Sequence, residues 1–369
     1  MYNWQLKDWP NFIFDPLKYV DEMQSYISRV SYLNGRFSAL GGTLRLDTEA
    51  ETLATEAIHT SRIEGENYDL DDLKSSILNN LDPKIKNRHV ADYRAEGLGK
   101  LMAYSRSTFD QRLTVNELFY WHELLLDYRK DLKAVGNWRQ STAPMQIISG
   151  AVGKERVHFE APPSDQVPKE MDRYVDWFNE TKRDSPTSGF FFAPIRAGIA
   201  HLYFESIHPF EDGNGRIGRI VAEKALSQAL PTPLPFSLSY GINQNKKAYY
   251  TALNKASLTL EIDEWLQYFI DTCFVALQAG EQYMDHVIKK FHFFDRYSQQ
   301  LDSRQEKALL KMFAAGPKGF QGGMTAKKYI HINRVSRATA TRDLQYLMKI
   351  GALQRIGQGR STRYEISGS

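Results

Sequence analysis

Cysteine is almost absent from this chain of 369 residues, and long apolar runs are missing altogether. The single cysteine, Cys273, excludes an internal disulfide framework and a CxxC zinc site. Because no run of about 18 apolar residues is present, we expect no transmembrane helix. The first residues lack the basic and apolar regions of a secretory signal, so we expect a cytoplasmic protein without membrane contact.

Proline and glycine are also too scarce for a collagen-like or low-complexity chain. The hydrophobic fraction of 42% and the charged fraction of 25% are those of an ordinary globular protein. At roughly 100–200 residues per domain, the length predicts two or three domains.

The net charge of +3 hides an asymmetry between two parts of the chain. Residues 304–369 contain 13 Lys and Arg against 3 Asp and Glu, so this part carries a net charge of +10. The preceding residues carry a net charge of −7. An acidic body with a basic C-terminal piece predicts different partners for the two parts.

Apolar spacing predicts a mainly helical chain. Helical periodicity is present over 48–62, 69–79 and 194–207, and again from about 216 to 230. Residues 145–163 differ, because two short apolar runs flank Ser-Gly and a further glycine there, which predicts a β-hairpin.

Between two of these helices lies the string HPFEDGNGRIGR, from His208 to Arg219. The turn from Gly213 to Gly215 can direct successive backbone N–H groups at an anion, and it precedes a helix whose dipole also favours an anion. Arg216 and Arg219, three residues apart, project from nearly one face of that helix. Two guanidiniums beside such a turn predict a polyphosphate site.

Two further residues of the string have the chemistry for group transfer. Asp212 is an oxygen ligand suited to Mg²⁺ held jointly with substrate phosphates. His208 can act as a general base on an incoming hydroxyl. The residues alone therefore predict a transferase that acts on a nucleotide phosphate.

The string resembles the signature of Fic-domain proteins, HPFx[D/E]GNGRxxR, and matches it at every defined position. The resemblance covers roughly residues 50–280 and implies a helical bundle. It also implies a protein adenylyltransferase, which moves AMP from ATP to a Ser, Thr or Tyr hydroxyl of a target protein and of itself. His208 would be the catalytic base and Asp212 the Mg²⁺ ligand. The implied ATP-binding residues are Gly213, Asn214, Gly215, Arg216, Ile217, Gly218, Arg219 and Tyr250.

The resemblance implies two further features. The hairpin at about 145–163 would be a flap that captures the target protein by strand addition. Tyr249-Tyr250-Thr-Ala-Leu253 is similar to the segment that lines the adenine pocket, but Ser257 stands where the family often has Asn.

An inhibitory motif precedes the signature. The segment from Thr60 to Gly65 matches the family pattern [S/T]xxxE[G/N] and puts Glu64 in the inhibitory position. Its carboxylate can pair with the guanidinium of Arg219 and displace the ATP phosphates. We therefore expect autoinhibition from a helix at about 48–65.

The basic tail resembles a winged helix-turn-helix, with three helices followed by a basic hairpin. In this interpretation, helix 336–350 enters a major groove with Arg337 and Arg342, and Arg360 contacts the DNA backbone. The alternatives are a winged helix used for protein contacts and a basic surface that is merely solvated.

Together these patterns predict a mainly α fold, a Fic-type helical bundle with a small β-hairpin flap and a C-terminal winged-helix domain. The expected boundaries are 1–100, 101–290 and 300–369. Duplex DNA and a second copy of the chain are further candidate partners. The competing functions are a DNA-binding regulator whose Fic core senses nucleotide, and an enzyme that uses another nucleotide or removes AMP.

Overall fold

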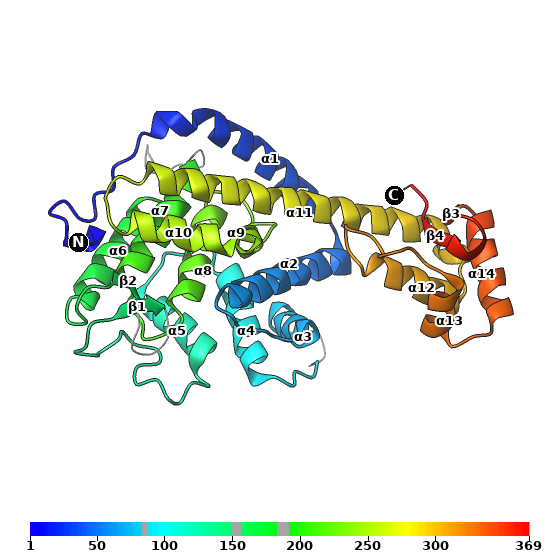
Figure 1. The fold of residues 1–369 in the computed structure, drawn as a ribbon, viewed down its shortest axis with the longest axis horizontal. Coiled ribbons are helices and arrows are strands. Elements are labelled where there is room, and N and C mark those ends of the chain that lie inside the picture. Colours follow the sequence, from blue (N-terminus) through cyan, green and yellow to red (C-terminus); the bar gives the residue numbers. More distant parts are fainter. Residues whose placement is uncertain (83, 85–87, 150–155, 183–191, 369) are drawn as a thin grey trace. The chain divides into compact units, whose positions relative to one another are not determined.

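The computed structural model describes residues 1–368 except 83, 85–87, 150–155 and 183–191 (Figure 1). The chain divides into two compact units, Met1–Gly280 and Glu281–Ser369. The division lies within the long helix α11 (Asp263–Tyr297). The expected mainly α fold class is confirmed.

Ten helices precede α11 in the described part of the first unit. They are α1 (Val20–Ser38), α2 (Gly42–Ile63), α3 (Leu70–Leu81), α4 (Tyr93–Ser107), α5 (Val115–Leu126), α6 (Val167–Glu180), α7 (Ala193–Ile207), α8 (Asn214–Ser227), α9 (Leu238–Gln244) and α10 (Lys246–Ala256). Short 3-10 turns at Asn3–Gln5 and Pro16–Tyr19 come before them.

Helices α7 and α8 form the centre of the first unit. Every residue of α7 is buried, as are most residues of α8. Pro194 lies in the first turn of α7, where its missing N–H costs no hydrogen bond. The helix ends at His208, whose φ of 51° is left-handed, and α8 begins after Gly213 with a φ of 82°. Two left-handed residues thus bound a tight connection between buried helices.

Helix α2 is longer than the sequence predicts, because it begins at Gly42 rather than near residue 48. It ends at Ile63, and Glu64 is its C-cap residue. Its Glu56 is 1% exposed and accepts hydrogen bonds from the Ser237 hydroxyl at 2.7 Å and the Ser239 backbone N–H at 2.9 Å. These bonds fix α2 to the start of α9.

The expected hairpin is present. Strands β1 (Gln146–Ser149) and β2 (Arg156–Glu160) pair antiparallel, with an irregularity between Ile147 and Ile148. The connecting residues of the predicted flap, 150–155, lie outside the described residues.

The N-terminal segment packs on α7 and on the base of the hairpin. The Asn3 amide donates to Ser206 Oγ at 2.8 Å, and the Trp4 indole donates to the Glu160 carbonyl at 2.7 Å. The Trp9 ring meets Tyr203 edge-on at 5.1 Å. This segment therefore braces both the central helix and β2.

The second unit follows the order expected for the tail, three helices and then a hairpin. After α11 come α12 (Ser303–Phe313), α13 (Ala326–Asn333), α14 (Arg337–Lys349), β3 (Leu353–Ile356) and β4 (Arg363–Ile366), joined by short 3-10 turns. The strands pair antiparallel, from Leu353 opposite Ile366 to Ile356 opposite Arg363. The unit has its own apolar core, which includes Leu309, Tyr329, Leu344, Leu347 and Leu353.

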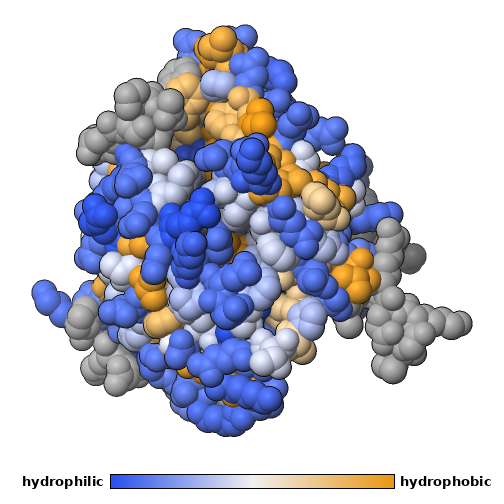
Figure 2. Space-filling view, turned by 90° about the vertical axis from the view of Figure 1, so that its left-hand side faces the viewer, coloured by the Kyte–Doolittle hydropathy of each residue, from blue (hydrophilic) through white to orange (hydrophobic). Residues whose placement is uncertain are grey.

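None of the helices in the described ranges is long and apolar enough to span a bilayer. The face drawn in Figure 2 carries mainly hydrophilic side chains, and the apolar ones form small groups between them.

Candidate active site

His208 lies at the C-terminal end of α7, where the chain turns toward α8. Its backbone N–H donates to the Phe204 carbonyl at 2.9 Å, and its side chain is 12% exposed. The left-handed conformation is uncommon for a non-glycine residue, and neighbouring contacts must hold it in place.

Arg139 is one of those contacts, and the sequence did not point to it. Its guanidinium is buried and donates to the His208 carbonyl at 2.8 Å and to Ser164 Oγ at 2.9 Å. Its backbone N–H also donates to the Pro209 carbonyl at 3.0 Å. Burial lowers the pKa of Arg139 to about 10. Arg139 thus fixes the backbone on both sides of the peptide bond that follows His208.

Contacts with Asn214 and His122 hold the residues that follow His208 in place. The Asn214 side chain accepts from the Phe210 N–H and donates to the Phe210 carbonyl, both at 2.8 Å. The Phe210 ring stacks on His122 at a centroid distance of 4.1 Å. The Gly136 N–H donates to His122 Nδ1 at 2.9 Å, so His122 Nε2 carries the proton that it donates to the Asp212 carbonyl at 3.1 Å.

The first turn of α8 presents backbone N–H groups beside this loop. Gly213 is the N-cap residue, and the first bond that closes the helix runs from the Ile217 N–H to the Gly213 carbonyl at 3.1 Å. The N–H groups of residues 214–216 therefore have no intrahelical acceptor. With the positive end of the helix dipole, they form an anion site.

Arg219 projects from α8 toward the end of α2. Its side chain is 1% exposed, and it donates to Thr60 Oγ1 at 2.7 Å and to Glu64 Oε1 at 2.6 Å. Burial alone would lower the pKa of Arg219, but Glu64, Tyr249 and Glu205 outweigh it and raise that pKa above its ordinary value. A Cβ on Gly215 would overlap Glu64 Oε1, so this carboxylate lies against the first turn of α8.

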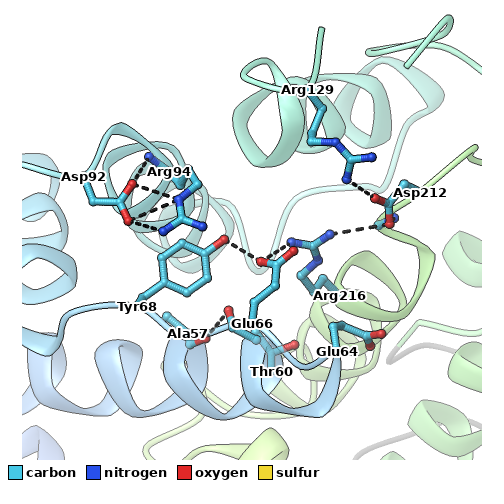
Figure 3. Close-up of polar contacts among 12 residues, drawn as sticks. Ala57, Thr60, Glu64, Glu66, Tyr68, Asp92, Arg94, Arg129, Asp212 and Arg216 are labelled. Carbon is cyan, nitrogen blue, oxygen red and sulfur yellow. Dashed lines mark hydrogen bonds and ion pairs between the residues drawn. The ribbon is translucent and has the colours of Figure 1, made fainter. Parts of the chain in front are cut away.

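Arg216 has a carboxylate partner of its own. Figure 3 shows its guanidinium between Glu66 and Asp212, with Nη1 2.9 Å from Glu66 Oε2 and Nη2 3.6 Å from Asp212 Oδ1. The Tyr68 hydroxyl donates to the same Glu66 oxygen at 2.6 Å. The Arg94 guanidinium lies over the Tyr68 ring at 5.2 Å. Glu66 is therefore held between Arg216 and Tyr68.

Asp212 is bonded to cationic and backbone groups. Its Oδ2 accepts from Arg129 at 2.7 Å, and its Oδ1 accepts from the Gly213 N–H at 2.6 Å (Figure 3). No group of three or more His, Cys, Asp or Glu side chains in the described residues could hold a metal without further ligands. A cation at Asp212 would therefore need further oxygen ligands from water or from a substrate.

Two donor atoms of the arginines have no hydrogen-bond partner among the residues that the structure describes. They are Arg216 Nε and Arg219 Nη1, both buried. Buried donors of this kind are normally satisfied by protein, water or ligand. Each of the two guanidiniums thus has an N–H group that a ligand could bond, which fits a phosphate-bearing ligand.

The other residues that the sequence analysis linked to nucleotide binding lie in different surroundings. Ile217 is fully buried, and a Cβ on Gly218 would lie 2.6 Å from Glu205 Oε1, so both face the protein interior. Tyr250 is half-buried, and its hydroxyl donates to the Ile63 carbonyl at 3.2 Å, next to Glu64. Ser257 caps α10, and its carbonyl accepts from the Asn3 N–H at 2.7 Å.

The candidate DNA-binding residues lie in the second unit. Arg337 and Arg342 are exposed on α14, whose Ala340, Leu344 and Leu347 are buried. Arg360 lies in the 3-10 turn between β3 and β4, and its side chain is outside the described part of the structure.

Residues 112–226, which include His208 and nearly all of α8, match the Fic/DOC family. This matched segment is called the Fic domain below. Residues 2–82, which include Glu64 and Glu66, match a family described as a domain of unknown function, DUF4172. The two carboxylates on the signature arginines therefore come from outside the Fic domain.

Distant relatives are named as adenylyltransferases. The protein adenylyltransferase Fic of Nematostella vectensis is 26% identical over 165 residues, which cover 44% of this chain and 33% of that protein. A probable protein adenylyltransferase of Aquifex aeolicus is 33% identical over 98 residues, 27% of this chain and 26% of that protein. The chain thus spans a third or less of the length of these curated relatives.

A solved structure extends the likeness of the fold beyond the Fic domain. A Fic family protein from Desulfovibrio desulfuricans G20 has a TM-score of 0.54 and 19% identity, over 98% of each chain. At this identity the likeness concerns the fold alone.

Proposed function

We propose that this chain is a protein adenylyltransferase, which transfers AMP from ATP to a serine, threonine or tyrosine hydroxyl of a target protein and of itself. The observation that carries the proposal is the position of His208 beside a helix N-terminus with two buried arginines. The unpaired N–H groups on both arginines support a polyphosphate ligand.

In this proposal the α8 N–H groups, Arg216 and Arg219 bind the triphosphate. His208 removes the proton of the target hydroxyl while its oxygen attacks the α-phosphorus. The new phosphorus–oxygen bond forms as the bond to the bridging oxygen breaks, and pyrophosphate leaves with the electron pair. The protein residues thus supply proton transfer and stabilisation of phosphate charge.

We assign Mg²⁺ to Asp212, whose Oδ1 accepts a hydrogen bond from the N–H of the α8 N-cap residue, Gly213. One carboxylate together with substrate phosphates is a usual arrangement for Mg²⁺. The ion would neutralise phosphate charge as pyrophosphate leaves. Because Arg129 bonds Asp212 Oδ2, this guanidinium must give way when the carboxylate takes the cation.

The hairpin and the groove at its base are the proposed site for the target protein. A groove of about 670 Å³ is lined by Trp4, Trp138, Arg139 and Glu160, among others. Arg139 also bonds the His208 carbonyl, so the groove adjoins the loop that carries the base. An extended target segment could pair with the edge of the hairpin.

We further propose that the segment before the Fic domain keeps the enzyme in a resting state. Glu64 holds Arg219 and lies where the α8 N-terminus would meet a phosphate. A carboxylate in this place competes with the γ-phosphate, and a misplacement of about 1 Å can lower the rate 10²-fold.

Glu66 adds a second restraint in this proposal. It pairs with Arg216, and the Tyr68 hydroxyl holds it in that position. Since Glu64 and Glu66 follow α2 within three residues, one movement of this segment can release both arginines.

A labelling experiment tests the reaction class. The unaltered chain and Glu64→Gly are incubated with ATP labelled at the α-phosphate or at the γ-phosphate. Protein labelled from the α position alone supports AMP transfer. Label from the γ position alone would establish phosphoryl transfer instead, and release of bound AMP from a labelled target would indicate the reverse reaction.

We also propose that the second unit binds duplex DNA. The supporting observation is that Arg337 and Arg342 are exposed on α14, whereas Ala340, Leu344 and Leu347 of the same helix are buried. In the full chain, Arg337→Ala/Arg342→Ala should lower the salt dependence of binding by about 1 in log–log slope per lost phosphate contact. The matched control is the exposed Lys311→Ala on α12, and no binding even by the unaltered chain at low salt would refute the proposal.

A further inference from the structure

Helix α7 and its C-cap residue carry three ionisable side chains, His201, Glu205 and His208. His201 and Glu205 are four residues apart and share one face of the helix, and His208 is the C-cap residue three positions later. His201 and Glu205 are buried, and Glu205 is 7% exposed. Glu205 Oε2 lies 3.7 Å from His208 Nδ1. A carboxylate oxygen thus lies beside Nδ1, the ring nitrogen of His208 that is nearer the backbone.

His208 Nδ1 is buried, and no described residue forms a hydrogen bond with it. The second oxygen of the carboxylate, Glu205 Oε1, is also buried without a hydrogen-bond partner among the described residues. Helix α8 approaches with backbone only, since a Cβ on Gly218 would lie 2.6 Å from Glu205 Oε1 and 3.1 Å from His201 Nδ1. A side chain at residue 218 would displace the carboxylate, so glycine there preserves the pair.

The surroundings keep Glu205 ionised. Burial by itself raises the pKa of this carboxyl, but His208, His201 and Arg219 together hold it below the ordinary value. Tyr174, Tyr249 and Tyr250 also face Glu205 from α6 and α10. The Tyr249 hydroxyl is 2.8 Å from His201 Nε2, so His201 links this cluster to α10.

We propose that Glu205 is a positioning residue for His208. Its carboxylate accepts a hydrogen bond from the Nδ1–H group of His208, which leaves Nε2 unprotonated and turned toward the target hydroxyl. When Nε2 accepts the proton of that hydroxyl, the carboxylate stabilises the imidazolium. The separation of 3.7 Å is longer than a hydrogen bond and shortens in the reacting complex, as is usual for catalytic contacts. The arrangement follows the logic of a hydrolase triad, in which a buried carboxylate fixes the tautomer of the base.

This proposal rests on the proposed AMP transfer for its kinetic test. In the Glu64→Gly background, Glu205→Gln should lower kcat by about 10²- to 10⁴-fold with little change in the KM for ATP. The acidic limb of the pH–rate profile should move to lower pH, because the imidazolium loses its counter-charge. Glu205→Asp should recover part of the rate, and the buried Glu117→Gln on α5 is the matched control for loss of an interior carboxylate.

Nitrogen NMR of the histidine rings tests the same proposal without any activity, with Glu205→Gln and a His208→Gln variant for assignment. The unaltered chain should have its proton on His208 Nδ1, and Glu205→Gln should shift the proton toward Nε2. An unchanged tautomer or an unchanged pH–rate profile in folded Glu205→Gln would overturn the proposal. If the Glu64→Gly parent transferred no AMP while the tautomer shifted, the proposed function would fail and the role of Glu205 would stand.

Discussion

Glu64 and Arg219 form an ion pair in which the guanidinium is 1% exposed and the carboxylate 29% exposed, with 2.6 Å between Oε1 and Nη2. The pair joins the C-cap of α2 to α8, the helix that follows the loop after His208. An arginine so deeply buried has no solvent to replace a lost partner. It therefore keeps its carboxylate until another anion enters.

Replacing Glu64 should release the enzyme. Glu64→Gly is expected to raise the rate of AMP transfer by about 10²-fold or more, with a smaller change in ATP affinity, because the γ-phosphate regains Arg219. The rate is measured as self-modification. Glu264→Ala, at a side chain that is 85% exposed, is the control and should match the unaltered chain. Equal rates for Glu64→Gly and this control would show that Glu64 does not restrain the enzyme.

Glu66 should restrain Arg216 in the same way but more weakly. Glu66→Gln removes the charge at 2.9 Å and is expected to raise the rate by less than Glu64→Gly does. Tyr68→Phe removes only the hydroxyl that orients Glu66, so its effect should lie between those of the unaltered chain and Glu66→Gln. The measurement is self-modification by single and double variants. A Glu64→Gly/Glu66→Gln rate no higher than that of Glu64→Gly would contradict a second restraint.

Arg129 should compete with Mg²⁺ for Asp212. Removing the guanidinium that bonds Oδ2 at 2.7 Å leaves this carboxylate oxygen available to the ion. Arg129→Gln, in the Glu64→Gly background, should therefore reach half-maximal rate at a several-fold lower Mg²⁺ concentration. Lys130→Gln, at a neighbouring side chain that is 78% exposed, serves as the control. If the Mg²⁺ dependence of Arg129→Gln and Lys130→Gln were the same, Arg129 would not compete with Mg²⁺ for Asp212.

Acidification should destabilise the fold through His122. Burial lowers the pKa of His122 from 6.5 to about 4. Between those values the unfolded chain binds more protons than the folded one, so stability falls as the pH falls from 6.5 to 4. Each unit of pKa difference corresponds to about 1.4 kcal/mol. His122→Gln should therefore show a shallower fall of Tm with pH than the unaltered chain.

The control for this series is His331→Gln, because His331 is exposed. A fall of Tm in His122→Gln as steep as in the control would mean that His122 is not the group that acidification charges. His59, whose pKa burial also lowers to about 4, should contribute to the slope that remains, as should His201 and His286, whose pKa values burial also lowers.

The fold class and the core of the site are readable in the sequence because their determinants are local. Helical periodicity marks α2, α7 and α8, and the string from His208 to Arg219 is one turn between two helices. Glu64 was accessible through a short motif, and its contact with Arg219 lies where that motif implies. The early start of α2 was missed because Gly41-Gly42 reads as a break, whereas here Gly41 is the N-cap and Gly42 begins the helix.

The residues that hold the site in place were not predictable in this way. Arg129, Arg139 and Glu66 reach their partners across 69 to 150 positions of the chain. No local sequence pattern marks these residues, and only the packing of α2, α5, α7 and α8 brings them to their partners. Glu205 could have been proposed from the sequence, since it lies four residues after His201, on the same helical face, and three residues before His208.

The most direct test of the account is transfer of label from α-labelled ATP by Glu64→Gly and by Glu64→Gly/His208→Ala, with ATP affinity measured for both. The account predicts strong labelling of the first protein and a loss of about 10²- to 10⁴-fold or more in the second, with ATP affinity retained. Equal labelling of the two proteins would show that His208 is not the base and would contradict the proposed mechanism.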